Sequence, residues 1–116
     1  MKLLDTNTLI ERLKEQRYEP NAISIITLIE VLRGLDDKKR GLVKQLLEES
    51  FEVKGLDNET IQTYCRVYQK LKKKATPLPD ADLLIAATAI TNNLPLVTRD
   101  EHFKYLREFG LELEEA

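Results

Sequence analysis

Short apolar runs alternate with longer segments of helical periodicity along almost the whole chain. The apolar runs are typical of buried strands, and the segments between them are typical of helices that bury one face. Such an alternation predicts an α/β domain in which helices flank a central, largely parallel sheet of four to five strands. Ligands of such domains bind outside the carboxyl ends of the strands, so the residues that follow each strand are the first candidates for function.

The boundaries follow from periodicity, turn residues and helix caps. Strands are predicted at residues 2–4, 22–26, 51–56, 94–97 and 111–113. Helices are predicted from 6 to about 16, at 28–35 and 36–50, from 58 to about 74, and at 81–92 and 101–109, with Asp57 as the cap of the fourth. The predicted apolar faces are Leu42, Val43, Leu46 and Leu47 on the third helix and Ile61, Tyr64, Cys65, Tyr68 and Leu71 on the fourth.

Length and composition exclude several classes of protein. The 116 residues predict one domain, spanning 1–116, and the net charge of −2 gives no global basic field for nucleic acid. Cys65 and His102 are the only residues of their types, so neither an internal disulfide nor a Cys/His zinc site is expected. The N-terminus does not resemble a signal peptide and no apolar run has the length of a membrane span, so we expect a cytoplasmic protein.

Two acidic residues stand where predicted strands end. Asp5 follows the first strand and Asp100 follows the fourth, with the hydroxyl of Thr98 just before it. Both positions suit a ligand-binding side chain at the rim of the sheet. Both also suit a helix cap, and the sequence alone leaves these alternatives open.

Two further acidic residues lie on helices. Glu30 interrupts an apolar helix, where its partner is either Arg33 or a cation shared with other carboxylates. Asp80 and Asp82 open the helix at 81–92, and negative charge there favours the helix dipole. We predict that Asp80 is the cap and that Asp82, one turn in, is functional.

Together these positions have a chemical meaning that none has alone. Carboxylates gathered in one cleft repel one another unless protons or cations neutralise them. A ligand set of oxygen atoms without a Cys or His cluster suits Mg²⁺ or Mn²⁺. Such a site activates water and stabilises the charge that develops when a phosphodiester is displaced. The four candidate residues are Asp5, Glu30, Asp82 and Asp100.

Three stretches of the chain resemble PIN-domain ribonucleases, and most of all the VapC-type toxins of toxin–antitoxin pairs: LLDTNTLI at residues 3–10, TLIEVLRGL at 27–35, and LPDADLLIAATAITNNLPLVTRDEHF at 78–103. The likeness covers essentially the full length and keeps the order of the motifs. It implies a PIN-like three-layer domain. Its acidic positions fall on Asp5, Glu30, Asp82 rather than Asp80, and Asp100, with Asn7 and Thr98 as polar support.

The resemblance also implies an activity and partners. Members of the family are Mg²⁺- or Mn²⁺-dependent endonucleases that hydrolyse single-stranded RNA. Those of the VapC type are homodimers silenced by a cognate antitoxin, which carries the DNA-binding part, so this chain is expected to meet DNA only through its partner. A PIN-fold RNA-processing nuclease outside a toxin pair and a catalytically silent interaction module remain alternatives. A receiver-like signalling domain with Asp57 as phosphoacceptor would leave Glu30 and Asp82 unexplained.

RNA binding also needs cations near the acidic cleft. The candidates are Arg12, Lys14, Arg33, Lys38, Lys39, Arg40 and Arg99. Of these, Arg33, Lys38, Lys39 and Arg99 are the principal ones. The run from Lys70 to Lys74 contacts RNA or is a solvated helix end, where lysines complement the helix dipole. Tyr18, Tyr64, Tyr68 and Tyr105 are candidates for base stacking, although Tyr64 and Tyr68 also suit a core or a dimer surface. Cys65 is predicted to be a small buried hydrophobe.

Overall fold

Five parallel strands form one sheet in the order β3-β2-β1-β4-β5. The computed structural model describes all residues from 1 to 116. The strands are β1 (Leu3–Leu4), β2 (Ala22–Ser24), β3 (Glu52–Lys54), β4 (Leu96–Thr98) and β5 (Leu113–Glu115). The helices are α1 (Thr6–Lys14), α2 (Ile25–Leu32), α3 (Asp37–Ser50), α4 (Asn58–Lys73) and α5 (Asp80–Thr91), followed by the 3₁₀ helix η1 (Glu101–Phe109). The predicted α/β class and the parallel sheet are therefore confirmed.

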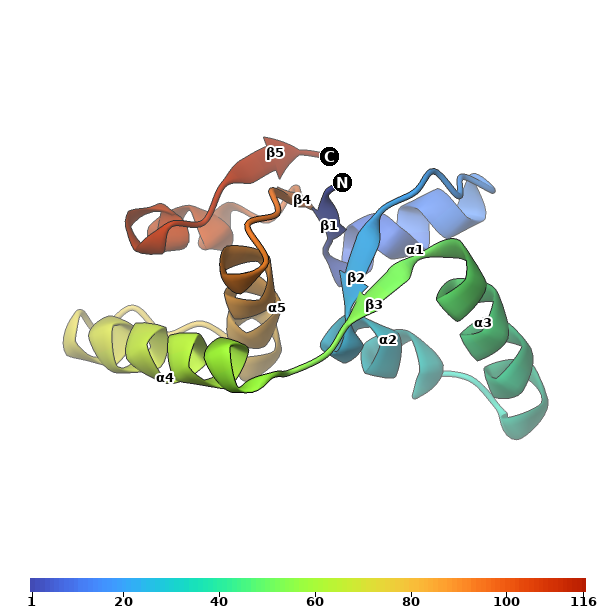
Figure 1. Cartoon of the computed structure of the whole chain (residues 1–116), viewed down its shortest axis with the longest axis horizontal. Coiled ribbons are helices and arrows are strands. Elements are labelled where there is room, and N and C mark those ends of the chain that lie inside the picture. Colours follow the sequence, from blue (N-terminus) through green and yellow to red (C-terminus); the bar gives the residue numbers. More distant parts are fainter.

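Helices cover both faces of the sheet, and neighbouring strand residues point to opposite sides. Leu3 packs with residues of α4, α5 and η1, whereas Leu4 packs with residues of α1, α2 and α3. Figure 1 shows these two groups of helices on either side of the strands. Because both faces are buried, the central strands are apolar on both sides rather than alternating, except at their last residues Ser24 and Thr98. No helix is both long and apolar enough to cross a membrane.

Side-chain caps decide several boundaries. The strand predicted at 22–26 ends at Ser24, because its hydroxyl accepts a hydrogen bond from the Ile26 amide and starts α2 at Ile25. Asp57 caps α4, as predicted, through bonds from the amide and hydroxyl of Thr60. These two bonds lower the pKa of Asp57. With its carboxylate engaged in this cap, Asp57 gives no support to the receiver-like alternative.

The predicted apolar face of α4 is only partly right: Leu71 is buried and Tyr64 packs against the core, but the other three residues are not buried. Its buried residues are Thr60, Thr63, Val67 and Leu71, whereas Ile61, Tyr68 and Cys65 are exposed. The helix packs closely on α5, whose facing residues include several alanines, so small threonines fit against it better than aromatic rings. The hydroxyl of the buried Thr60 also bonds that of the partly exposed Thr91 on α5 at 2.9 Å.

The predicted face of α3 is also only partly right. Leu47 is completely buried, but Leu42 is 71% exposed and Leu46 is 39% exposed. The helix contacts α2 and β3 along a narrow line, so only one of its leucines reaches the core.

Candidate functional site

The carboxyl ends of β1 and β4 lie next to each other and bring Asp5 and Thr98 together. The register pairs Leu4 with Val97, so the residues after them meet at the same edge. Asp5 is 6% exposed, and its two carboxylate oxygens have separate partners. Oδ1 accepts from the Thr8 amide at 2.9 Å, and Oδ2 accepts from the Thr98 hydroxyl. Asp5 is thus both a helix cap and a fixed acidic group at the rim of the sheet.

Asp100 joins the same cluster through Thr98. The Thr98 hydroxyl oxygen accepts from the Asp100 amide at 3.0 Å while its proton goes to Asp5. Asp100 Oδ1 caps η1 by accepting from the His102 amide, and it also contacts His102 Nδ1 at 2.8 Å. Thr98 therefore links two of the predicted carboxylates, and His102 lies on the solvent side of the second.

A short chain of hydroxyl groups holds Glu30. The Thr6 hydroxyl donates to Glu30 Oε1 at 2.7 Å, and the fully buried Thr27 hydroxyl lies 3.1 Å from that of Thr6. Because the Thr6 proton is used on Glu30, Thr27 must donate to Thr6. The Glu30 side chain is only 22% exposed, and the guanidinium of the exposed Arg33 lies 3.8 Å from its other oxygen. The sequence analysis did not predict this role for Thr6.

Asp82 lies half-buried in the first turn of α5, and the charges of the other three carboxylates affect its pKa. Burial, followed by the negative charges of Asp100, Glu30 and Asp5, raises the pKa of Asp82 above the ordinary carboxyl value. The nearby His102 opposes this shift. The charges of three residues from three other segments thus act on Asp82.

The prediction that Asp80 caps α5 is wrong. Pro79 occupies the cap position, and no side chain caps this helix. Asp80 is instead the first helical residue, and its Oδ1 accepts a hydrogen bond of 2.7 Å from the hydroxyl of Tyr64 on α4. This bond and the partial burial of the ring raise the pKa of Tyr64 to about 12. Asp80 thus ties α5 to α4 through Tyr64.

A groove of about 460 Å³ runs beside the cluster. Its lining residues are Asp5, Asn7, Thr8, Ile10, Glu11, Lys14, Arg99 and Asp100. Arg99 pairs with Glu11 at 3.3 Å across the groove, so one wall carries cations close to the carboxylates. The sequence analysis did not name Glu11, although it lies one turn after Asn7 on the same face of α1.

Other predicted cations lie outside this groove. Arg33, Lys38 and Lys39 are exposed and do not line it. Lys38 and Lys39 are in the first turn of α3, which Figure 1 places at the far end of α2, on the opposite side of the molecule from α5. Arg99 and Lys14 are therefore the predicted cations that line the groove, whereas Arg33 contacts the acidic cluster only at Glu30.

Comparison with known proteins decides the family. The model of the PIN domain family matches residues 2–108. This chain belongs to the PIN-domain family. The resemblance seen in the three sequence stretches is thus confirmed, and the match covers every predicted acidic residue.

The relatives of this PIN domain are of the VapC type. It is 43% identical over 115 residues to Ribonuclease VapC1 of Methanocaldococcus jannaschii, an alignment that covers 96% of this chain and 85% of the relative. The structure of VapBC2 from Rickettsia felis, bound to a DNA fragment from its promoter, matches with a TM-score of 0.81 and 25% identity over 98% of this chain and 97% of the other. VapBC-5 of Mycobacterium tuberculosis, from a family of toxin–antitoxin systems, matches with a TM-score of 0.70 and 26% identity over 98% and 95% of the two chains.

The donor chemistry of the cluster suits a hard divalent cation. Its polar atoms are carboxylate and hydroxyl oxygens, which Mg²⁺ and Mn²⁺ prefer over nitrogen or sulfur. As the side chains stand, no three His, Cys, Asp or Glu residues form a ready-made metal cluster. Mutual repulsion keeps ionised carboxylates apart, and Mg²⁺ retains several waters in protein sites. The residues present therefore fit an ion that is held partly through water.

Proposed function

We propose that this PIN domain is a Mg²⁺- or Mn²⁺-dependent endoribonuclease that hydrolyses phosphodiester bonds of single-stranded RNA. The raised pKa of Asp82, caused by burial and by three other carboxylates, is the observation that carries the proposal. A bound cation would neutralise the repulsion between these carboxylates. The relative at 43% identity also carries the name ribonuclease.

In this proposal Asp5, Asp82, Asp100 and Glu30 hold the metal, directly or through water. The bound ion supplies an activated water and neutralises the charge that grows on the phosphate oxygens during displacement. The chain itself contributes orientation. Thr98 and the Thr8 amide fix both oxygens of Asp5, and Thr6 fixes one oxygen of Glu30. Asn7, Lys14 and Arg99 line the groove in which the phosphate backbone would lie.

We further propose that the nuclease is the toxin of a type II toxin–antitoxin pair and acts as a homodimer in the cytoplasm. The VapBC structures that the chain resembles over nearly its full length support the pairing with an antitoxin. The cognate antitoxin would inhibit the nuclease, and the antitoxin rather than this chain would contact the DNA. Growth arrest on expression, relieved by Asp82→Asn or by co-expression of the antitoxin, would support this role. An RNA-processing nuclease outside a toxin pair would cut RNA without arresting growth.

The direct test is an RNA cleavage assay with purified chain free of any partner. Cleavage is expected with Mg²⁺ or Mn²⁺ and should stop with a chelator. Asp5→Asn is the matched control, because an asparagine side chain can still cap α1 but lacks the charge. If the folded chain cuts no RNA with either ion while Asp5→Asn binds a partner as well as the unsubstituted chain, the silent interaction module is correct.

Thr6→Val tests whether the hydroxyl chain positions Glu30. The substitution keeps the shape of Thr6 but removes its only donor to that carboxylate. We expect kcat for RNA cleavage to fall by about 10–100-fold, as for other groups that orient metal ligands. The free energy of unfolding should fall by only about 1 kcal/mol. Thr6→Ser keeps the hydroxyl and should restore kcat, and an unchanged kcat in Thr6→Val would contradict this role.

A further inference from the structure

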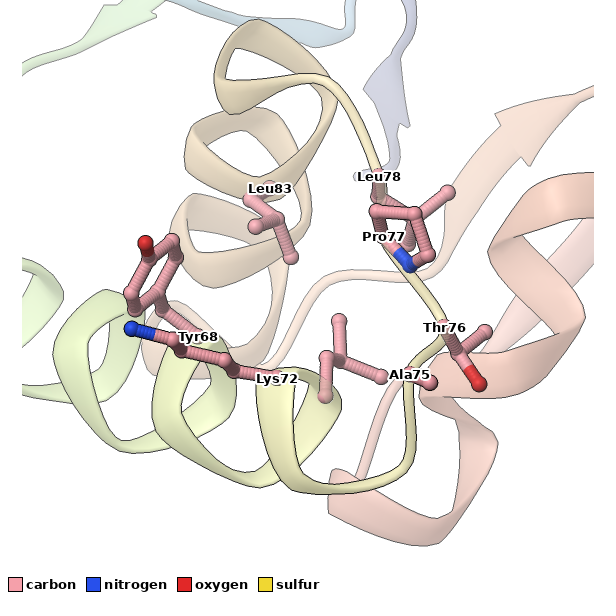
Figure 2. A pocket seen from close by; sticks show the side chains of 8 residues that line it. Tyr68, Lys72, Ala75, Thr76, Pro77, Leu78 and Leu83 are labelled. Atoms are coloured by element: carbon pink, nitrogen blue, oxygen red, sulfur yellow. The ribbon is translucent and has the colours of Figure 1, made fainter.

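A second functional surface lies where α4 passes into α5, outside the acidic groove. An apolar pocket of about 420 Å³ is lined by Tyr68, Leu71, Lys72, Ala75, Thr76, Pro77, Leu78 and Leu83. Figure 2 shows the Lys72 side chain running past the Tyr68 ring on α4, with Leu83 on α5 and Pro77 and Leu78 on the connecting segment. A second hollow of about 390 Å³ is lined by Leu71, Lys74, Thr76, Lys104, Tyr105, Arg107 and Glu108. The two hollows share Leu71 and Thr76, so they adjoin each other where α4 passes into the connecting segment.

This surface is strongly basic although the chain as a whole is not. The end of α4 and the neighbouring η1 carry six cations, Lys70, Lys72, Lys73, Lys74, Lys104 and Arg107, in a protein of net charge −2. Only Lys74 and Lys104 form ion pairs, with Glu108 and Glu101 respectively. The other four have no carboxylate partner. Of these four, Lys72 lines the apolar pocket and Arg107 lines the basic hollow. Unpaired cations on such a surface attract a polyanion.

Aromatic side chains stand among these cations. Tyr68 is 43% exposed and lines the apolar pocket, and Tyr105 is 56% exposed and lines the basic hollow. The Tyr68 ring is also stacked against that of Tyr64, with the centroids 6.0 Å apart, which limits its freedom to move. Exposed aromatic rings beside a positive groove are the combination that binds unpaired bases and the backbone that joins them.

The surface also adjoins the acidic site. Leu83, which closes the apolar pocket, directly follows Asp82 on α5. The hydrogen bond from Tyr64 to Asp80 joins α4, which carries Tyr68, to the same first turn of α5. A strand whose phosphate lies at the carboxylates therefore has this surface within reach of its neighbouring nucleotides.

We propose that this surface binds single-stranded RNA beside the bond that is cut, with a base in the apolar pocket against Tyr68 and the backbone phosphates on Lys72, Lys74 and Arg107. The inference rests on the proposed ribonuclease function and adds a determinant of substrate choice. A purely apolar partner, such as a second copy of the chain, would leave the unpaired cations without a role.

The test measures RNA binding in an Asp82→Asn background, so that the probe stays intact. The probe is a fluorescent single-stranded oligouridylate. The double substitution Lys72→Gln/Arg107→Gln removes two cations, one from each hollow, and should raise Kd roughly tenfold. It should also flatten the dependence of log K on log salt by about 1.4, since each single-strand phosphate contact contributes about 0.7. Lys44→Gln/Lys54→Gln, on α3 and β3, removes the same charge elsewhere and should leave Kd nearly unchanged.

A second pair of variants tests base stacking. Tyr68→Ala should weaken binding by about fivefold or more, whereas Tyr68→Phe keeps the ring and should bind normally. Equal Kd values for the Lys72/Arg107 double variant and its charge-matched control would overturn the proposal. So would a change of oligomeric state in the Lys72/Arg107 variant during sedimentation, or a loss of affinity for a purified protein partner without a loss for RNA.

The cleavage assay separates this proposal from the one on which it rests. If the chain with Asp82 intact cuts RNA, and the Lys72/Arg107 variant cuts and binds it equally well, the RNA surface is wrong while the ribonuclease stands. If the unsubstituted chain neither cuts nor binds RNA, both proposals fall.

Discussion

Asp82→Asn should reduce RNA cleavage by roughly a thousandfold or more while the protein stays folded. Metal-assisted stabilisation of the developing charge is worth several kcal/mol, and about 1.4 kcal/mol corresponds to a factor of ten in rate. The amide has nearly the shape of the carboxylate but lacks its charge. It also removes the half-buried negative group that the other carboxylates destabilise, so the metal-free variant should be at least as stable as the parent at neutral pH.

Asp80→Asn is the matched control for this prediction. Asp80 lies two residues earlier on the same helix and bonds Tyr64 instead of facing the carboxylates. The asparagine oxygen can still accept that hydrogen bond, so kcat/KM should change by no more than about threefold. The measurement is kcat/KM on one RNA substrate for both variants. A large loss in Asp80→Asn with normal cleavage by Asp82→Asn would exchange the roles we assign to the two residues.

Adding Mg²⁺ should stabilise the protein, and Asp82→Asn should reduce that gain. At a free concentration of about a hundred times Kd, a ligand that binds only the folded state adds about 2.7 kcal/mol. This corresponds to a rise in Tm of roughly 10 °C for a domain of this size. Thermal unfolding followed by circular dichroism, with Mg²⁺ or with EDTA, measures the gain without any reference to RNA. An equal shift in the parent and Asp82→Asn would mean that the ion binds elsewhere.

The same experiment has a defined pH dependence. The pKa of Asp82 is raised in the folded state, so the folded protein holds this proton more tightly than the unfolded chain does. The associated stability is fully present below the ordinary carboxyl pKa and is lost as pH rises through the folded-state value. In EDTA, Asp82 therefore contributes a fall in Tm across this window, and Asp82→Asn removes that contribution. Mg²⁺ binds the ionised form, so the difference in Tm between Mg²⁺ and EDTA should grow over the same window.

Much of the site was predictable because its signals are local. Asp5, Asp82 and Asp100 each stand beside an apolar strand or at the start of an apolar helix, and Glu30 interrupts an apolar helix. The PIN-like motif order then favoured Asp82 over Asp80. The structure also separates these two residues. Asp80 accepts a hydrogen bond from Tyr64, whereas the pKa of Asp82 is raised in part by the other carboxylates.

Errors arose where a residue's role depends on a distant segment. Tyr68 and Cys65 were assigned to the buried face of α4 because hydrophobic side chains at helical spacing usually face a core. The close approach of α5 selects small residues instead, so Thr60 and Thr63 are buried. The hydrogen bond between Thr6 and Glu30 joins two helices and spans 24 positions of the chain. No residue pattern within either helix predicts it.

The sequence by itself determined the order of strands and helices, the parallel sheet and the placement of acidic residues at its rim. It could do so because periodicity, capping and strand ends are properties of neighbouring residues. The tertiary structure alone decided which polar group holds each carboxylate, which face of α4 is buried, and how the basic end of α4 meets η1. These outcomes depend on distances between segments that are far apart in the chain. The packing of the helices on the sheet sets those distances.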